Sequence, residues 1–353
     1  MKKALFVVSS TGGHLYPAIS IISKFADKQA DFYIIAPESL KSKIADSAFV
    51  NNSSVIYQPD VSLTKIPNIL KNTLSSLKIT NKVNTVVSLG SIFCVPVSIS
   101  SKINRRKLIV MDQNVLPGRA TRFLSIFADH VIVPFSESLR FLPFKSKTIV
   151  MLCPIRQEIQ SLVCQDNNHD MLESILFFGG SLGSKTINQL SIEFIKNLDG
   201  TFKSVKVIAG KNLFSDYVNQ IREMWGKNFE LISDDKVVFS VNGCIVNVIK
   251  YSVSMADVYK DAKVIVSRAG GSSLSELLYL NKRAVVIPYP YAMDNHQLWN
   301  AKVVKEYVNF IDYLQEPIDY KEFFEKLERV LNVKPRFERQ VRFFDYEFFW
   351  NLI

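Results

Sequence analysis

Short, continuous runs of apolar residues alternate along the chain with longer stretches that carry apolar residues at helical spacing. Such runs are typical of strands in parallel sheets, which helices cover on both faces. The runs are residues 4–8, 32–35, 85–89, 108–110, 131–133, 174–178, 205–208, 264–266 and 284–287. The polar residues 165–170 separate the two series of runs and are interpreted as a linker. The pattern predicts two Rossmann-like α/β domains.

Length and composition agree with this prediction. A chain of 353 residues suits two domains of about 150 residues each, and 48% hydrophobic with 22% charged residues is typical of a folded globular protein. The formal net charge of +10 favours an anionic partner, which could be a phosphate ligand, an acidic lipid or a nucleic acid. Nucleic acid is the least favoured of these, because the basic residues are scattered rather than interleaved with aromatic residues.

The cysteines and the apolar runs indicate a cytoplasmic location. Cys94, Cys153, Cys164 and Cys244 lack the spacing of zinc sites or disulfide frameworks. The first apolar run is too short for a signal peptide, and no run approaches the roughly 20 residues of a spanning helix. We therefore expect a protein that touches a membrane without crossing it. The aromatic residues 343–350 are expected to pack against another surface.

Two glycine-rich turns follow predicted strands. Gly12 and Gly13, with His14 next to them, stand where the first strand gives way to a helical pattern. Residues 177–185 read Phe-Phe-Gly-Gly-Ser-Leu-Gly-Ser-Lys and repeat that arrangement in the second half. Glycine lets a ligand approach the backbone N–H groups of a helix N-terminus, which suits a phosphate or a polar sugar. The alternative is that both segments are plain tight turns and that His14 is a surface residue.

Two further polar segments follow strands in the second half. In the segment 267–276, the residues around Gly270 have small side chains, which leaves room for a diphosphate. Glu276, later in the same segment, could accept hydrogen bonds from both hydroxyls of a ribose. Alternatively, Glu276 is a solvated helix residue. Asp294, Asn295, His296 and Gln297 form a cluster that could bind sugar hydroxyls, or in which Asp294 or Asn295 caps a helix.

Six ordered segments together resemble the MurG family of glycosyltransferases. They are TGGH at 11–14, QN at 113–114, Pro-x-Arg at 154–156, GGSxG at 179–183, an R-x-G…SE block at 268–276 and HQxxNA at 296–301. The resemblance implies the GT-B fold, an α/β architecture in which two Rossmann-like domains face each other across a cleft. It also implies an inverting transfer of N-acetylglucosamine from UDP-GlcNAc to lipid I, which forms lipid II in peptidoglycan synthesis.

The resemblance also implies roles for individual residues. The diphosphate would be held by Arg156 and Ser181, the ribose by Glu276, and the uracil edge by Tyr251 and Ser252. Asn114, His296 and Gln297 would address the sugar, and Asn188 would support the loop. The UDP-GlcNAc-binding residues are accordingly Thr11, Gly12, Gly13, Asn114, Arg156, Ser181, Gly183, Asn188, Tyr251, Ser252, Gly270, Glu276, His296 and Gln297.

His14 would face the acceptor, and either His14 or Asp112 would remove or relay the acceptor proton. We expect no metal and no cofactor, because the chain lacks an Asp-x-Asp donor-metal motif. Residues 1–157 would form the domain that faces the acceptor and the membrane, and the tail from about 338 to 353 could pack back on it. Residues 158–337 would bind the UDP-sugar. The chain departs from the usual family pattern at Ser9 and Ser10, where the family has glycines, and at residues 90–92 and 111–114.

Residues 63–82 carry Ile66, Leu70, Leu74 and Leu77 at helical spacing among four lysines. This pattern favours peripheral docking on the anionic cytoplasmic face of the inner membrane, where the polyprenyl-diphosphate-linked acceptor lies. Alternatively, these residues form the buried face of a core helix. Three other functions stay open: a GT-B transferase with another lipid acceptor such as diacylglycerol, a UDP-sugar epimerase, and a non-catalytic donor-binding subunit.

Overall fold

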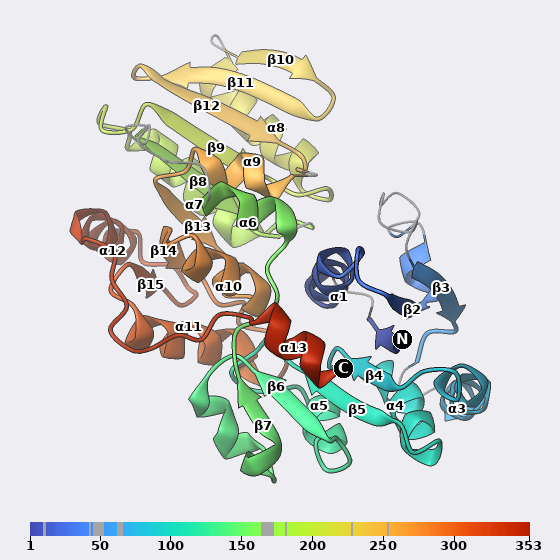
Figure 1. Ribbon diagram of the computed structural model, residues 1–353. Coiled ribbons are helices and arrows are strands. Elements are labelled where there is room, and N and C mark those ends of the chain that lie inside the picture. The colour runs from blue at the N-terminus through green and yellow to red at the C-terminus, as the bar shows by residue number, and fades with distance from the viewer. Residues whose placement is uncertain are drawn as a thin grey trace. The chain divides into compact units, whose positions relative to one another are not determined.

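The computed structural model describes residues 1–9, 12–41, 44, 53–61, 66–163, 173–180, 182–226, 229–252 and 254–353 (Figure 1). These residues form two compact units. Unit 1 comprises Met1–Gln157 and Val341–Ile353, and unit 2 comprises Glu158–Gln340. The expected linker at 165–170 lies outside the described residues. Within the described residues, no helix combines the length and the apolar character that crossing a bilayer requires.

Unit 1 contains a seven-stranded sheet in the order β3-β2-β1-β4-β5-β6-β7, and each of its described strand pairings is parallel. The strands are β1 (Lys2–Val7), β2 (Ala30–Pro37), β3 (Ser53–Gln58), β4 (Thr85–Ser88), β5 (Lys107–Met111), β6 (His130–Val133) and β7 (Thr148–Val150). The α-helices are α1 (Gly12–Lys24), α3 (Ile66–Thr80), α4 (Cys94–Ile103), α5 (Arg119–Leu124) and α13 (Tyr346–Leu352). Short 3₁₀ helices are η1 (Glu38–Leu40), η3 (Ser136–Phe141) and η4 (Lys145–Lys147).

Strand β1 shows why the apolar runs are continuous rather than alternating. Successive side chains of a strand point to opposite faces of the sheet. Phe6 packs in one buried cluster, with residues of α1, and Leu5 and Val7 pack in another, with residues of α4 and α5. All three side chains are fully buried. A strand covered on both faces needs an apolar residue at every position.

The C-terminal segment of unit 1 is anchored in the same core as α1. Phe349 is fully buried in the cluster that contains Phe6, and the ring of Trp350 lies 4.8 Å from that of Phe25. Lys2 fixes the end of the segment, because its Nζ donates hydrogen bonds to the carbonyl oxygens of Trp350 and Ile353. The aromatic residues of this tail thus complete the hydrophobic core of unit 1.

Unit 2 contains an eight-stranded sheet in the order β10-β11-β12-β9-β8-β13-β14-β15. The strands are β8 (Ser174–Phe178), β9 (Ser204–Ile208), β10 (Phe229–Ser233), β11 (Lys236–Val241), β12 (Cys244–Ile249), β13 (Val264–Ser267), β14 (Arg283–Val286) and β15 (Ile311–Tyr313). The helices are α6 (Gln157–Val163), α7 (Lys185–Lys196), α8 (Phe214–Trp225), α9 (Met255–Lys260), α10 (Gly271–Tyr279), η6 (Met293–Asn295), α11 (His296–Tyr307) and α12 (Tyr320–Asn332).

The edge of this sheet differs from the wholly parallel prediction, because β10, β11 and β12 pair antiparallel. The turn between β11 and β12 consists of Asn242 and Gly243, whose φ angles are 49° and 78°. Asn-Gly with two positive φ angles is the preferred two-residue hairpin turn, because its twist matches that of the strands. The Asn-Gly pair was therefore a hairpin signal that the sequence analysis missed.

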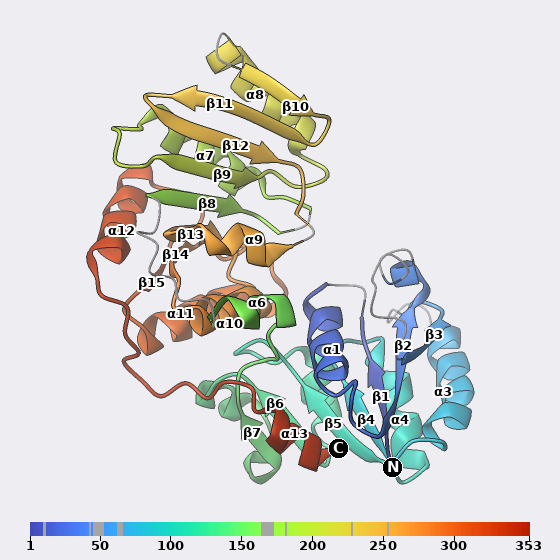
Figure 2. The same cartoon turned by 45° about the horizontal axis from the view of Figure 1, so that its top comes forward.

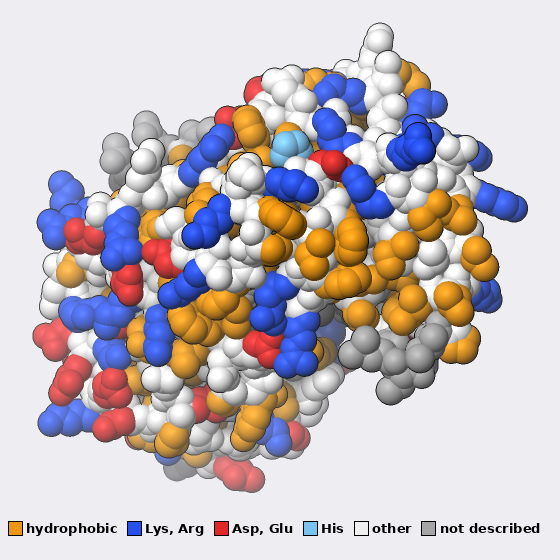
Figure 3. Space-filling model, turned by 90° about the horizontal axis from the view of Figure 1, so that it is seen from below, with side chains coloured by type: hydrophobic (Ala, Val, Ile, Leu, Met, Phe, Trp, Pro, Cys, Tyr) orange, Lys and Arg blue, Asp and Glu red, His pale blue; other side chains and the backbone are white. Residues whose placement is uncertain are grey.

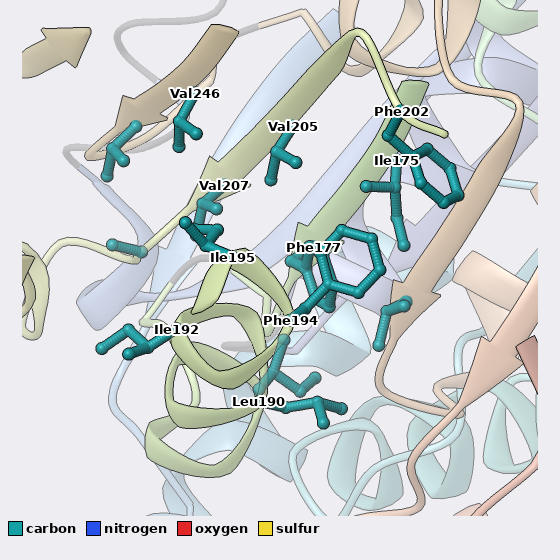
Figure 4. Close-up of a cluster of buried hydrophobic side chains, with 14 of the residues drawn as sticks. Ile175, Phe177, Leu190, Ile192, Phe194, Ile195, Phe202, Val205, Val207 and Val246 are labelled. Atoms are coloured by element: carbon teal, nitrogen blue, oxygen red, sulfur yellow. The ribbon is translucent and has the colours of Figure 1, made fainter. Parts of the chain in front are cut away.

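Helix α7 covers one face of the sheet in unit 2. Its residues Phe194 and Ile195 lie towards the sheet, where β8 presents Phe177 and β9 presents Val207 (Figure 4), and Leu190 is buried in the same cluster. The rings of Phe177 and Phe194 lie 5.4 Å apart. Ile187, in the first turn of α7, is fully buried in the same cluster and anchors the start of the helix, which follows the glycine-rich loop.

Each sheet reverses its direction of winding beside its first strand. In unit 1, β2 pairs with one edge of β1 and β4 pairs with the other edge. In unit 2, β8 lies between β9 and β13 (Figure 2). Ligands of open α/β sheets bind outside the carboxyl ends of the strands at such switch points. The fold therefore marks one candidate ligand site in each unit.

Candidate functional site

His14 lies at the switch point of unit 1, in the first turn of α1. It lines a small cavity together with residues that follow β4 and β5, including Gly90 and Asp112. The Oγ atom of Ser9, which follows β1, lies 2.5 Å from Nδ1 of His14. Gly12 and Gly13 begin the same helix. The structure thus brings His14 and Asp112, the two candidate bases, to one cavity.

The carboxylate of Asp112 is occupied by donors from its own loop. Its Oδ1 accepts from the backbone N–H of Asn114 at 3.0 Å, and its Oδ2 accepts from the N–H of Gly118 at 2.9 Å and from Oγ1 of Thr121 at 2.6 Å. Nδ2 of Asn114 also donates to Oδ1, at 3.2 Å. A carboxylate that accepts several hydrogen bonds is fixed in one orientation. This arrangement suits Asp112 to shaping the loop of Asn114, and it favours His14 as the base.

Gly90 could not be replaced without disturbing that loop. Its φ of 55° is in the left-handed region, and a Cβ atom there would lie 2.8 Å from Oγ1 of Thr121.

Arg156, predicted to hold the diphosphate, comes just before α6 and is half-buried. Its guanidinium carbon lies 5.0 Å from the ring centroid of Tyr16, which is on α1. A cation stacked on an aromatic ring is held in a limited set of orientations.

The glycine-rich loop of unit 2 follows β8 and is pressed against the loop that follows β9. Gly183 has a φ of +91°, and a Cβ atom there would lie 2.3 Å from the carbonyl oxygen of Ala209. The buried Asn188 on α7 donates from Nδ2 to that same oxygen at 3.0 Å. Ser184 caps α7 by accepting from the N–H of Ile187. Two of the predicted residues, Ser181 and Thr11, lie outside the described residues.

Arg268, directly after β13, connects the loops on both sides of the switch point. Its Nη2 donates to Oγ of Ser184 at 2.8 Å, and its Nη1 forms an ion pair with Glu316 at 2.6 Å. The Arg268 side chain is 15% exposed, so this ion pair is shielded from water. In the sequence, Arg268 stood out only as part of a motif. No pattern in the sequence indicated that it would reach Ser184, 84 residues earlier.

Glu276 is not a solvated helix residue, because it is only 6% exposed on α10. The hydroxyl of Tyr259, a fully buried residue of α9, donates to its Oε2 at 3.1 Å. Gly270 is the N-cap of the same helix. A buried carboxylate with one oriented oxygen is suited to accept hydrogen bonds from a bound diol.

The other predicted donor residues of unit 2 lie in loops and at helix starts. His296 is the first residue of α11, and its Nδ1 lies 2.9 Å from the carbonyl oxygen of Met293. Since a carbonyl only accepts, Nδ1 carries the hydrogen and Nε2 is left for another group. Oε1 of Gln297 accepts from the N–H of Tyr289 at 2.9 Å. Asn295 occupies the N-cap position of α11 with a φ of 54°.

Tyr251 and Ser252 follow β12. The Nζ atom of Lys211, which follows β9, lies 4.3 Å from the ring centroid of Tyr251. Ser252 donates from Oγ to the carbonyl oxygen of Ser254 at 2.7 Å, which shapes the turn before α9. Among the residues with defined positions, no group of three or more His, Cys, Asp or Glu side chains is arranged to hold a metal ion.

Helix α3 exposes part of its apolar stripe. Leu70 is 63% and Leu74 is 67% exposed, whereas Leu77 is half-buried. The alternative of a wholly buried face is therefore wrong for Leu70 and Leu74. The side chain of Ile66 lies outside the described residues. Lys71, Lys78 and Lys82 line a groove between α3 and β3.

Further exposed apolar side chains lie on or just after α4 and α5: Ile103, Phe123, Ile126 and Phe127. The rings of Phe123 and Phe127 lie 5.5 Å apart, edge to face. Figure 3 shows hydrophobic side chains gathered on the face in view, with Lys and Arg side chains beside them. These four residues were not predicted from the sequence.

Comparison with known proteins identifies both units. The N-terminal domain of glycosyltransferase family 28 matches residues 5–133, and the C-terminal domain of that family matches residues 174–344. A relative from Caldanaerobacter subterraneus subsp. tengcongensis is 27% identical over 345 residues, which cover 93% of this chain and 90% of the relative. A relative from Trichodesmium erythraeum is 28% identical and covers 85% and 76% of the two chains. Both are named UDP-N-acetylglucosamine–N-acetylmuramyl-(pentapeptide) pyrophosphoryl-undecaprenol N-acetylglucosamine transferase.

Solved structures give the same fold. MurG of Acinetobacter baumannii superposes with a TM-score of 0.71 at 20% identity, covering 94% of this chain and 91% of that one. The UDP-GlcNAc 2-epimerase of Methanocaldococcus jannaschii superposes with a TM-score of 0.67 at 12% identity, covering 99% of both chains. The predicted GT-B class with two Rossmann-like α/β domains is confirmed, and so is the resemblance to the MurG family.

Proposed function

We propose that this chain, which belongs to glycosyltransferase family 28, transfers N-acetylglucosamine from UDP-GlcNAc to lipid I and so forms lipid II. The two domains of the family match it in order, and a relative that carries the name of this transferase aligns with 93% of its length. The observation that carries the proposal is the arrangement at the switch point of unit 2. There Arg268 joins the loop after β8 to the loop after β13, and Glu276 lies buried on the helix that follows.

Unit 2 has the groups that a uridine diphosphate requires. The N-terminus of α10, at Gly270 and Gly271, offers backbone N–H groups and partial positive charge to the diphosphate. Glu276, oriented by Tyr259, accepts the ribose hydroxyls. Tyr251 and Lys211 form a side wall for the uracil. His296 and Gln297 bind the sugar through the atoms that their backbone contacts leave free.

Unit 1 supplies the base. The acceptor hydroxyl attacks the anomeric carbon, its O–H bond breaks, and the proton passes to Nε2 of His14. The bond between the anomeric carbon and the diphosphate oxygen breaks at the same time, and its electron pair leaves with UDP. Arg156 and the helix N-terminus in unit 2 stabilise the growing negative charge. We propose that the reaction needs no metal, so EDTA should leave the rate unchanged.

We further propose that unit 1 docks peripherally on the anionic cytoplasmic face of the inner membrane. Leu70 and Leu74 are exposed on α3 beside Lys71 and Lys78. Each lysine near an anionic surface contributes about 1 kcal/mol. Vesicles rich in phosphatidylglycerol should co-sediment the protein at low salt, and a Leu70→Glu, Leu74→Glu variant should bind less. Ile245→Glu, at an exposed strand position of unit 2, is the matched control and should bind like the wild type.

The transfer itself is tested with labelled UDP-GlcNAc in three reactions: with lipid I, with diacylglycerol, and without acceptor. We expect label in lipid II only in the first reaction, and a loss of at least about 100-fold in kcat for His14→Ala. Conversion of the donor without acceptor would indicate an epimerase, which shares this fold. Donor binding without any transfer would indicate a non-catalytic subunit. Either of these results would overturn the proposal.

A further inference from the structure

Ser9 contacts His14 but has no role in the reaction as proposed above. Ser9 follows β1 and is 5% exposed, and its Oγ atom lies 2.5 Å from Nδ1 of His14. Nδ1 is therefore occupied by a neighbour from the same unit. The ring of His14 lines the cavity at the carboxyl ends of β4 and β5, where Asp112 and Cys153 also lie.

The direction of the hydrogen bond between Ser9 and His14 decides what His14 is able to do. A neutral imidazole carries one hydrogen, on either Nδ1 or Nε2. If the Ser9 hydroxyl donated to Nδ1, the hydrogen would be on Nε2, and His14 could not accept a proton there. If the Ser9 oxygen accepts from Nδ1–H, Nε2 keeps its lone pair and can accept a proton from the acceptor hydroxyl.

The position of His14 in the helix adds a second requirement. His14 lies in the first turn of α1, where the partial positive charge of the helix disfavours an imidazolium ion. The same partial charge opposes proton uptake by the imidazole during the reaction. An oxygen that accepts from Nδ1–H offsets part of that cost, since a hydrogen bond to a charged donor is stronger than one to a neutral donor.

We infer that Ser9 is a positioning residue that holds His14 as the Nδ1–H tautomer, so that Nε2 accepts the proton of the acceptor hydroxyl. The inference rests on the proposed function, because it assigns His14 the role of base. It adds a residue that touches no substrate and acts only through the imidazole.

The tautomer is measured directly by ¹⁵N NMR of the histidine rings in the full chain. The chain has four histidines, and His14→Gln identifies the His14 signals by their loss. In the wild type we expect Nδ1 protonated and Nε2 unprotonated. In Ser9→Ala we expect the population to move towards Nε2–H, and in Ser9→Thr, which keeps a hydroxyl, we expect it to stay. A wild type with hydrogen on Nε2, or a Ser9→Ala variant with an unchanged tautomer, would overturn the inference.

Kinetics give the second readout. Ser9→Ala should lower kcat about tenfold, the upper end for one hydrogen bond, and leave KM for UDP-GlcNAc within about twofold. Ser9→Thr should restore most of the rate. Ser88→Ala removes another buried serine hydroxyl, at the end of β4, and should leave kcat unchanged. If Ser88→Ala and Ser9→Ala lowered kcat alike, the effect would be structural and the inference would fail.

Failure of this inference is distinguishable from failure of the proposed function. If the wild type transfers N-acetylglucosamine and His14→Ala does not, but Ser9→Ala is as fast as the wild type, only the role of Ser9 is lost. If the wild type transfers nothing to any acceptor, the proposed function fails and the role of Ser9 in catalysis fails with it. Ser9→Gly replaces Ser9→Ala if circular dichroism shows that the alanine variant does not fold.

Discussion

Replacing Gly183 with alanine tests the construction of the donor loop in unit 2. Gly183 has a φ of +91°, which costs a residue with a Cβ atom about 1–2 kcal/mol. The new Cβ would also lie 2.3 Å from the carbonyl oxygen of Ala209 and 3.1 Å from Cα of Gly210. Because both neighbours are backbone, they move only if the loop moves, and such overpacking costs about 1–3 kcal/mol. We therefore expect a total loss of about 2–5 kcal/mol.

Gly200 provides a matched control. Its φ is +93°, but among the described residues no heavy atom lies within 4 Å of the position its Cβ would take. Gly200→Ala therefore has the backbone cost alone, about 1–2 kcal/mol. Urea unfolding monitored by circular dichroism gives both losses, provided that the slopes of the two variants agree. Calorimetry should show weaker UDP-GlcNAc binding for Gly183→Ala and unchanged binding for Gly200→Ala. Equal losses of stability in the two variants would refute the close approach of the loops.

Three further predictions follow from buried polar groups in unit 2. Burial lowers the pKa of Lys282 from 10.5 to about 8, so between these pH values the native state has lost a proton that the unfolded state keeps. The free energy of unfolding should therefore rise by up to about 3 kcal/mol from pH 8 to pH 10.5. Unfolding curves measured across this range should show the rise in the wild type and not in Lys282→Met. Glu276→Ala should weaken binding of UDP at least tenfold, or about 1.4 kcal/mol, but should weaken binding of 2′,3′-dideoxy-UDP much less, which calorimetry with both ligands measures. Tyr259→Phe removes the donor to Glu276 and should weaken UDP binding two- to tenfold; unchanged affinity would mean that Glu276 is oriented by other groups.

The sheet cores were predictable because their signal is local. In strand β1, Leu5 and Phe6 are both apolar because helices cover both faces of the sheet. A continuous apolar run therefore predicts a buried strand even when the strands beside it are unknown. The antiparallel edge of unit 2 was also within reach, since Asn242 and Gly243 form the preferred hairpin turn. The short strands β7 and β15 gave too weak a signal, because each has only three residues.

The site was predictable in its segments but not in its contacts. Glycine-rich turns after strands pointed to Gly183 and Gly270, and the segment that contains Gly270 pointed to Glu276 as a ribose ligand, a role that the family resemblance also implied. The hydrogen bond from Arg268 to Ser184 depends on how β8 and β13 come together, which no local pattern specifies. For the same reason, the burial of Glu276 against Tyr259 could not be foreseen.

The central claim is that UDP-GlcNAc binds at the switch point of unit 2, and hydrogen exchange with mass spectrometry tests it most directly. Saturating UDP-GlcNAc should slow exchange in peptides that contain the loops after β8 and β13 and the first turn of α10. The hairpin of β11 and β12, at the edge of the same sheet, should exchange at the same rate with and without ligand. Slower exchange confined to unit 1, or no change anywhere at saturation, would contradict the account.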